Sequence, residues 1–175
     1  MTEPVPDGAV ETLYGDYNAL VSDLSASPSG LTALNRSYHK HLLVAAASSL
    51  EDKVKSLIPE IFARHGTDRL AAFVAKQVMA RGYHTLFDWP NGKAQGFFTS
   101  FGEACGAAFK EALRSEAELK EQHDAFMTLG QLRNQVVHND YASALIELTP
   151  SEIMDRYGLA LQFVDRIESF VIVTP

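Results

Sequence analysis

Residues 31–57 read "LTALNRSYHKHLLVAAASSLEDKVKSL", and this stretch decides the fold class. Its apolar residues recur at steps of three and four, which places them along one face of an α-helix. The positions that form this face are Leu34, Tyr38, Leu42, Ala45 or Ala46, and Leu50. The spacing therefore predicts a long helix that contributes to the core.

Helical spacing continues on both sides of this stretch, without the sustained alternation that is typical of strands. "SASPSG" at residues 25–30 separates the long helix from an earlier one, and "TPSE" at residues 149–152 resembles a capping box. Pro59 either kinks the long helix or opens its last turn. Residues 82–94 are the one long segment expected to be irregular. The predicted helices cover about residues 9–24, 31–57, 67–81, 95–113, 115–138 and 150–170.

Length and composition indicate one helical domain. The chain has 175 residues, of which 46% are apolar and 21% charged, and this size suffices for a substantial core. We expect an all-α fold, an up-and-down helical bundle of five to six helices with two long central helices. The expected domain spans residues 1–175, with a short mobile N-terminus at about residues 1–8.

Sequence features also bear on compartment and partners. The only cysteine, Cys105, fits a reducing compartment, because it leaves no intrachain disulfide. The start "MTEPVPDGAV" lacks the basic and apolar regions of a signal peptide, and "HLLVAAASSL" is too short to span a membrane. We therefore expect a soluble cytoplasmic protein. The net charge of -7 argues against a general nucleic-acid coat protein, although a local basic site is compatible with it.

The stretch "RNQVVHND" at residues 133–140 is the sharpest functional pattern. Ideal helix geometry centres the apolar stripe near Arg133 and places Asn134 and His138 together on the neighbouring face. A guanidinium is costly to bury without a partner, and its planar fork suits a carboxylate or a phosphate. Arg133 could equally snorkel or pair with Glu51, while His138 interacts with the helix dipole. The residue types alone leave both interpretations open.

The order Arg, Asn, three variable residues and His, late in an all-helical chain, resembles the HEPN superfamily. Many members of this superfamily are metal-independent endoribonucleases. Arg133, Asn134 and His138 occupy the motif positions. "HLLVAAASSLEDKVKSLI", "NGKAQGFFTSFG" and "FMTLGQLRNQVVHND" are similar to the HEPN branch found beside RiboL-PSP-like modules and in bacterial defence proteins. The resemblance covers about residues 31–170.

This resemblance implies a catalytic site without metal or other cofactors. His138 would exchange protons with the RNA, Arg133 would hold a phosphate oxygen, and Asn134 would orient His138 or the phosphate. The 2′-hydroxyl of RNA would be the nucleophile, which gives a 2′,3′-cyclic phosphate end and leaves DNA intact. Related domains often carry an acidic residue near Glu51, which would support Arg133 or His138. A solvated charge on the helix face is the more common role of such a residue.

The resemblance also implies partners, namely an RNA substrate, a second copy of the chain, and an antitoxin or sensor protein. On an ideal helix Arg133 and His138 point about 140° apart, so two copies facing each other would supply both groups to one cleft. HEPN toxins paired with nucleotidyltransferase antitoxins carry His-x-Tyr, whereas "HNDY" places Tyr141 one position later. Regulation by tyrosine adenylylation is therefore not expected.

Two alternatives to a ribonuclease remain open. The first is a HEPN-like module without catalysis, which serves dimerisation, nucleotide sensing or partner binding. The second is a helical interaction protein in which Arg133 belongs to a structural ion pair. The oligomeric state separates the second alternative from the others, and RNA cleavage that depends on His138 separates the ribonuclease from the first.

Other conspicuous motifs favour structural roles. His39 and His41 are two residues apart, so on a helix they point away from each other and do not form a metal site. The helical spacing of Phe97, Phe98 and Phe101 is typical of core residues rather than of a base-stacking surface. The glycines that flank Cys105, at positions 102 and 106, predict a close helix crossing.

Overall fold

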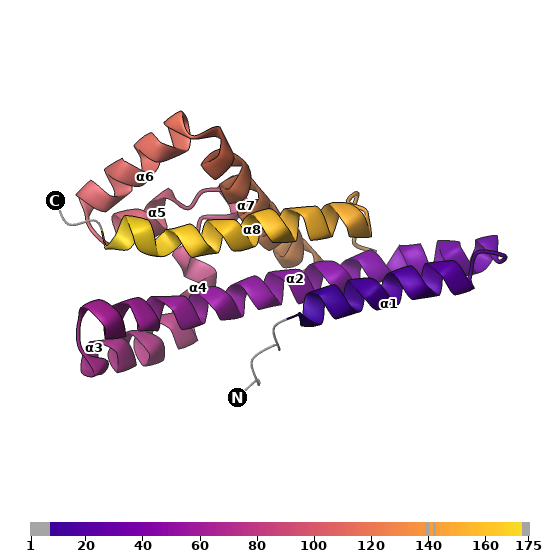
Figure 1. The fold of residues 1–175 in the computed structure, drawn as a ribbon, viewed down its shortest axis with the longest axis horizontal. Coiled ribbons are helices and arrows are strands. Elements are labelled where there is room, and N and C mark those ends of the chain that lie inside the picture. The colour runs from indigo at the N-terminus through magenta and orange to yellow at the C-terminus, as the bar shows by residue number, and fades with distance from the viewer. Residues whose placement is uncertain (1–7, 139–140, 142, 173–175) are drawn as a thin grey trace.

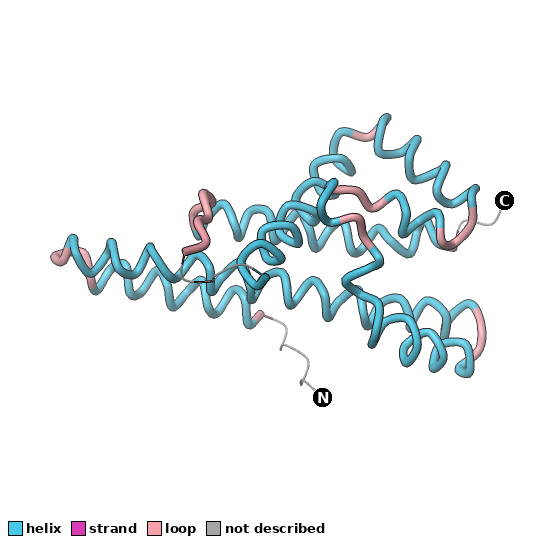
Figure 2. The backbone as a smooth tube through the Cα atoms, turned by 180° about the vertical axis from the view of Figure 1, so that it is seen from behind, coloured by secondary structure: helices cyan, strands magenta, loops and turns pink. Residues whose placement is uncertain are grey.

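The computed structural model describes residues 8–138, 141 and 143–172, without the side chains of residues 80 and 81. Within these residues every regular secondary-structure element is a helix and no strand occurs (Figure 2), which confirms the all-α prediction. The expected mobile N-terminus lies, except for residue 8, outside the described residues. The elements are α1 (Ala9–Asp23), α2 (Pro28–His65), α3 (Asp68–Phe73), a π-helix (Val74–Met79), α4 (Ala80–Leu86), a 3₁₀ helix (Trp89–Asn91), α5 (Gln95–Thr99), α6 (Glu103–Ser115), α7 (Ala117–His138) and α8 (Pro150–Val171).

Helix α2 is longer than the sequence predicts at both ends. Ser27 caps its first turn by accepting a hydrogen bond from the backbone N–H of Gly30 at 3.3 Å, and Pro28 takes the first helical position. Both features favour a helix start, because they satisfy or remove N–H groups that have no helical partner. At the other end, α2 continues through Pro59 to His65. Pro59 therefore lies inside the helix instead of ending it.

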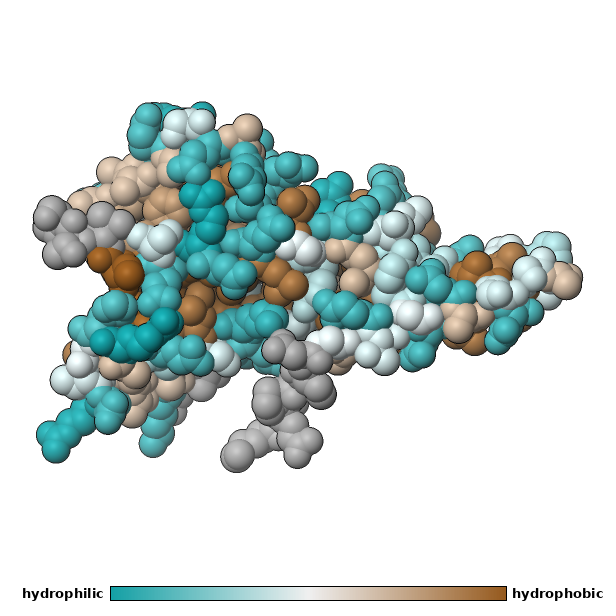
Figure 3. Space-filling view, viewed as in Figure 1, coloured by the Kyte–Doolittle hydropathy of each residue, from teal (hydrophilic) through white to brown (hydrophobic). Residues whose placement is uncertain are grey.

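The two ends of α2 have different neighbours. Its first turns pair with α1, where the Tyr38 hydroxyl donates to the Leu13 carbonyl at 2.8 Å. This hairpin extends beyond α8 (Figure 1) and forms a narrow projection in the space-filling view (Figure 3). The buried residues of α2 begin at Lys40 and end at Ile61. The central part of α2 therefore carries the contacts with the rest of the domain.

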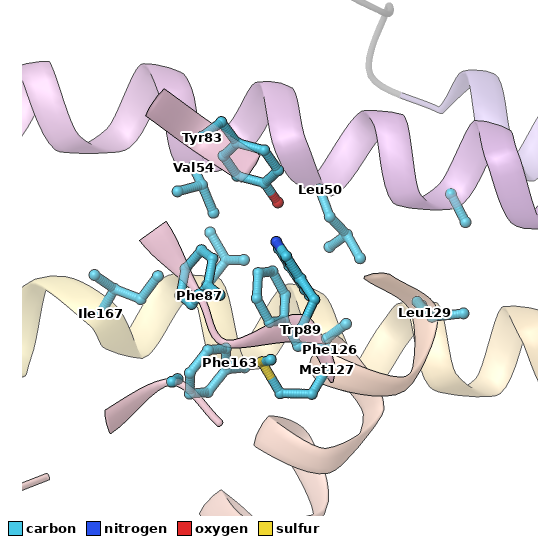
Figure 4. Close-up of a cluster of buried hydrophobic side chains, with 14 of the residues drawn as sticks. Leu50, Val54, Tyr83, Phe87, Trp89, Phe126, Met127, Leu129, Phe163 and Ile167 are labelled. Atoms are coloured by element: carbon cyan, nitrogen blue, oxygen red, sulfur yellow. The ribbon is translucent and has the colours of Figure 1, made fainter. Parts of the chain in front are cut away.

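The core lies where α8 packs against both α2 and α7 (Figure 1). Aromatic residues dominate it, with Phe87, Trp89, Phe126 and Phe163 between the helices (Figure 4). The largest fully buried side chains are Phe98, Phe109, Phe126, Phe163, Leu42, Leu43, Leu50, Leu119, Met127, Leu129, Ile153 and Ile167. Phe97 is also buried, and Phe101 packs against the edge of the core. Phe97, Phe98 and Phe101 are therefore core residues, as predicted.

The segment between α2 and α5 contains more helix than expected. The predicted helix at 67–81 continues as α3, the π-helix and α4 to Leu86, so the irregular part starts later than residue 82. The buried positions explain the π-helix. Val74 and Met79 are five residues apart, and Tyr83 and Phe87 then follow at steps of four. A π turn absorbs a step of five and keeps all four side chains on the core side.

The two glycines beside Cys105 have different roles. A Cβ on Gly106 would lie 2.4 Å from Thr99 Oγ1, so a close crossing of α5 and α6 occurs there, as predicted. Gly102 has nothing within 4 Å of such a Cβ, so the prediction of a close crossing is wrong at this position. Its backbone has φ 120°, a conformation that glycine adopts readily, and it separates α5 from α6.

The capping box at the start of α8 is confirmed. Thr149 Oγ1 accepts from the backbone N–H of Glu152, and the Glu152 carboxylate accepts from the backbone N–H and hydroxyl of Thr149. These hydrogen bonds lower the pKa of Glu152. None of the helices in the described part of the chain is long and apolar enough to cross a membrane.

Candidate active site at the end of helix α7

Arg133 belongs to α7, and its side chain extends toward α2. Its side chain is 20% exposed, and its Nη2 atom is 3.9 Å from Glu51 Oε2 on α2. Its Nη1 atom donates to Asn134 Oδ1 at 3.1 Å. The guanidinium is thus fixed by a carboxylate from another helix and by the amide that follows it in the sequence. This arrangement leaves the planar donor fork partly open to a further anion.

Glu51 is a partly buried group of this site rather than a fully solvated charge. Its side chain is only 14% exposed, and it forms a short ion pair with Lys55 one turn further along α2. The carboxylate therefore lies between two cations, Lys55 and Arg133. This geometry differs from that of a fully solvated charge, and the supporting role in catalysis that the resemblance implies stays a prediction.

Tyr83 and Trp89 line the same small hollow as Glu51 and Arg133. Tyr83 is 6% exposed, and burial raises the pKa of its hydroxyl, with a further increase from Glu51 and an opposing effect of Arg133. The hydroxyl is therefore a neutral group near neutral pH. The indole Nε1 of Trp89 is buried and has no hydrogen-bond partner. In Figure 4 the Tyr83 oxygen and the Trp89 nitrogen point toward each other.

A glycine on α7 allows this packing. A Cβ on Gly130 would lie 2.0 Å from Trp89 Cζ3, which is far shorter than any nonbonded contact of a Cβ atom. Trp89 can therefore lie directly against the α7 backbone only because position 130 has no side chain. Gly130 precedes Arg133 by about one helical turn, so the same part of α7 holds the indole and the guanidinium.

Two neighbouring hollows open beside these residues. The larger is an open groove of about 520 Å³, lined by His84, Trp89, Pro90, Gln131, Asn134, Gln135 and His138. The smaller is lined by Ala47, Glu51, Tyr83, His84, Trp89, Gly130, Arg133 and Asn134. Arg133 thus lines one hollow and His138 the other, while Asn134 lines both. The structure brings Arg133, Asn134 and Glu51 into contact and places the exposed His138 beside them in the groove.

His84 is a site residue that sequence reasoning missed. It is exposed and lines both hollows, together with Asn134 and Trp89. It comes from α4, far from α7 in the sequence, and its spacing to other polar residues carries no signal. Only the packing of α4 against α2 and of Trp89 against α7 brings it to the groove.

The family comparison adds an independent finding. The family model described as RiboL-PSP-HEPN matches residues 14–172. The chain belongs to the RiboL-PSP-HEPN family. No curated protein and no solved structure matches the chain. All of Arg133, Asn134, His138 and Glu51 lie within the matched residues.

The turn after α7 is tied to α2 in this HEPN domain. The buried Lys40 donates to the Tyr141 carbonyl at 2.8 Å, and its ammonium lies 5.4 Å from the centre of the Tyr141 ring. The Tyr141 hydroxyl is 3.4 Å from His41 Nδ1. These contacts fix the chain three residues beyond His138, so α2 positions both Arg133 and the end of α7.

The remaining histidines serve packing or surface roles. His123 is buried, accepts a hydrogen bond from the backbone N–H of Ala94 at 3.4 Å and contacts Asp124 at 2.9 Å. His41 contacts Tyr141, and His65 contacts Glu168. Among the described residues no group of three or more His, Cys, Asp or Glu side chains is arranged to hold a metal ion.

Substitution of Gly130 by alanine tests whether Trp89 depends on the bare α7 backbone. We expect Gly130→Ala to lower the free energy of unfolding by about 1–3 kcal/mol, because the added methyl group overpacks the contact. Trp89 is the only tryptophan, so its fluorescence reports the displacement directly. The emission maximum should shift to longer wavelength, and urea unfolding gives the free energy.

The matched control is Gly158→Ala on α8, where nothing lies within 4 Å of the added Cβ. Alanine is the better helix former at such a position by roughly 0.5–1 kcal/mol, so this variant should be as stable as the wild type or more stable. Equal stability and unchanged fluorescence of Gly130→Ala would contradict the described packing.

Proposed function

We propose that this HEPN domain is a metal-independent endoribonuclease that acts as a homodimer. The observation that carries the proposal is the geometry at the end of α7, where a fixed guanidinium and an exposed imidazole lie beside the same amide, Asn134. Arg133 supplies charge for a phosphate oxygen, and His138 supplies proton transfer. Asn134 lies beside both Arg133 and His138 and orients their side chains.

The reaction is a transesterification within the RNA strand. The 2′-oxygen attacks the adjacent phosphorus, the bond from phosphorus to the 5′-oxygen breaks, and a 2′,3′-cyclic phosphate and a 5′-hydroxyl end form. DNA lacks the nucleophile and is not cleaved. The charge that grows on the phosphate in the transition state is stabilised by Arg133, which Glu51 and Asn134 hold in place.

Exposed apolar side chains near the site support a dimer. Val137 is 46% exposed, Tyr141 43% and Leu145 92%. All three lie at the end of α7 or in the turn that follows it, close to His138 in the sequence. Their burial against a second copy would be favourable and would bring two sites together. We infer that the biological role is that of a toxin or antiviral effector acting on cellular RNA, controlled by an antitoxin or sensor protein.

One observation favours the non-catalytic alternative, a HEPN-like module for dimerisation, nucleotide sensing or partner binding. Glu51 already pairs with Arg133, so the motif arginine has a structural counter-charge without any substrate. Under that alternative His138 contributes nothing to RNA cleavage, and the first experiment below separates the two functions.

The central prediction concerns cleavage of a structured RNA by the purified protein in EDTA. We expect the wild type to leave 2′,3′-cyclic phosphate ends and to spare DNA of the same sequence. Arg133→Ala and His138→Ala should each reduce the rate by about 10²–10⁴-fold, the usual contribution of one proton-transfer or oxyanion-stabilising group.

Each variant is first compared with the wild type in thermal stability and oligomeric mass. Arg69→Ala on α3, a surface arginine outside both hollows, is the control and should cleave normally. A wild type that is inert, or variants that cleave as fast as the wild type, would favour the non-catalytic module.

A second prediction concerns the dimer. Leu145→Glu should raise the dissociation constant of the dimer at least about tenfold, because an unpaired carboxylate in an apolar interface is costly. Sedimentation equilibrium measures the constant. Leu70→Glu, on α3 at a position that is 50% exposed, is the matched control and should leave it unchanged. A monomeric wild type, or equal constants for the wild type and Leu145→Glu, would refute the proposed interface.

A further inference from the structure

His84 places a second imidazole in the groove that holds His138. Both side chains are exposed, and both line the same open groove of about 520 Å³. They come from different helices, α4 and α7, and His84, like Asn134, also lines the hollow that holds Arg133. The groove is thus bordered by two groups of the kind that exchanges protons near neutral pH.

The position of His84 is fixed by its buried neighbours. Tyr83 directly precedes it and Phe87 follows one turn later, and both are buried in the aromatic core. The Tyr83 and His84 rings meet edge to face with their centres 5.9 Å apart. The core therefore anchors α4 on both sides of His84, while its imidazole remains open to a ligand. The charged groups that line the adjoining hollow are Glu51 and Arg133.

The proposed reaction needs two proton transfers at different oxygens. The 2′-hydroxyl loses a proton as its oxygen attacks phosphorus, and the departing 5′-oxygen gains one as its bond to phosphorus breaks. Attack and departure occur on opposite sides of the phosphorus, so one imidazole is poorly placed to serve both oxygens. His138 accounts for one transfer only.

We infer that His84 is a second catalytic residue, which shares general acid and general base catalysis of RNA cleavage with His138 of the same chain. This inference rests on the proposed ribonuclease function. One imidazole starts neutral and takes the proton of the 2′-hydroxyl, and the other starts protonated and gives its proton to the 5′-oxygen. The two histidines end with their protonation states exchanged, and proton exchange with water restores them. No further reactant is required.

The test uses RNA with a single 5′-bridging sulfur at the cleavage site. A thiolate leaves without being protonated, so this substrate no longer needs the general acid. On ordinary RNA, His84→Gln and His138→Gln should each slow cleavage by about 10²–10⁴-fold. On the sulfur-containing RNA, one of the two variants should recover to within about tenfold of the wild type, while the other stays slow. The variant that recovers identifies the general acid. The variant that stays slow should lose the acidic limb of the wild-type pH–rate profile, which identifies the general base, whereas loss of a residue with a structural role would lower the rate and leave the shape of the profile unchanged.

His65→Gln is the matched control, because His65 is also exposed but contacts Glu168 and lies outside the groove. It should cleave both substrates like the wild type. If His84→Gln cleaves ordinary RNA at the wild-type rate, or if neither or both slow variants recover on the sulfur-containing RNA, the role of His84 is overturned while the ribonuclease function stands. If the wild type cleaves neither substrate, the proposed function itself fails, and the role of His84 fails with it.

Discussion

Arg133 carries a charge that cannot be neutralised, and only 20% of its side chain is exposed. This constraint governs the site, because a guanidinium in such a position needs a counter-charge and hydrogen-bond acceptors. Glu51 supplies the charge from α2, and Asn134 supplies an acceptor from α7. Such pairs often contribute little to stability, since desolvation offsets their attraction. The proposed binding of a substrate anion would give this arginine a role beyond the ion pair with Glu51.

The surrounding fold serves to hold these groups. Glu51 can face Arg133 because α2 buries its central part against α7 and α8. The bare backbone at Gly130 admits the Trp89 ring, which lines both hollows and packs against Tyr83 with ring centres 6.0 Å apart. The π turn before α4 keeps Tyr83 in the core and thereby brings His84 to the groove.

Local patterns in the sequence predicted much of this structure. The long helices, the Thr149–Glu152 capping box and the Arg133, Asn134 and His138 positions all follow from spacings of a few residues. The roles of His84, Tyr83 and Gly130 depend on contacts between distant segments, which no spacing reveals. Ideal helix geometry also centred the apolar stripe on Arg133, yet Val137 is 46% exposed because α7 ends there. The helix end, where packing stops, is where periodicity is least informative.

The most direct test of the central claim is an NMR titration of the Arg133 side chain with a nucleoside 3′-monophosphate. The Nε–H signal is assigned by its absence in Arg133→Lys, and the signal of Arg64, which pairs with Glu168 away from the groove, is the internal reference. If Arg133 is held in place to bind phosphate, its signal shifts and saturates with the nucleotide while that of Arg64 does not. If the nucleotide binds and the Arg133 signal stays unchanged, Arg133 is only the counter-ion of Glu51, and the account of this site is wrong.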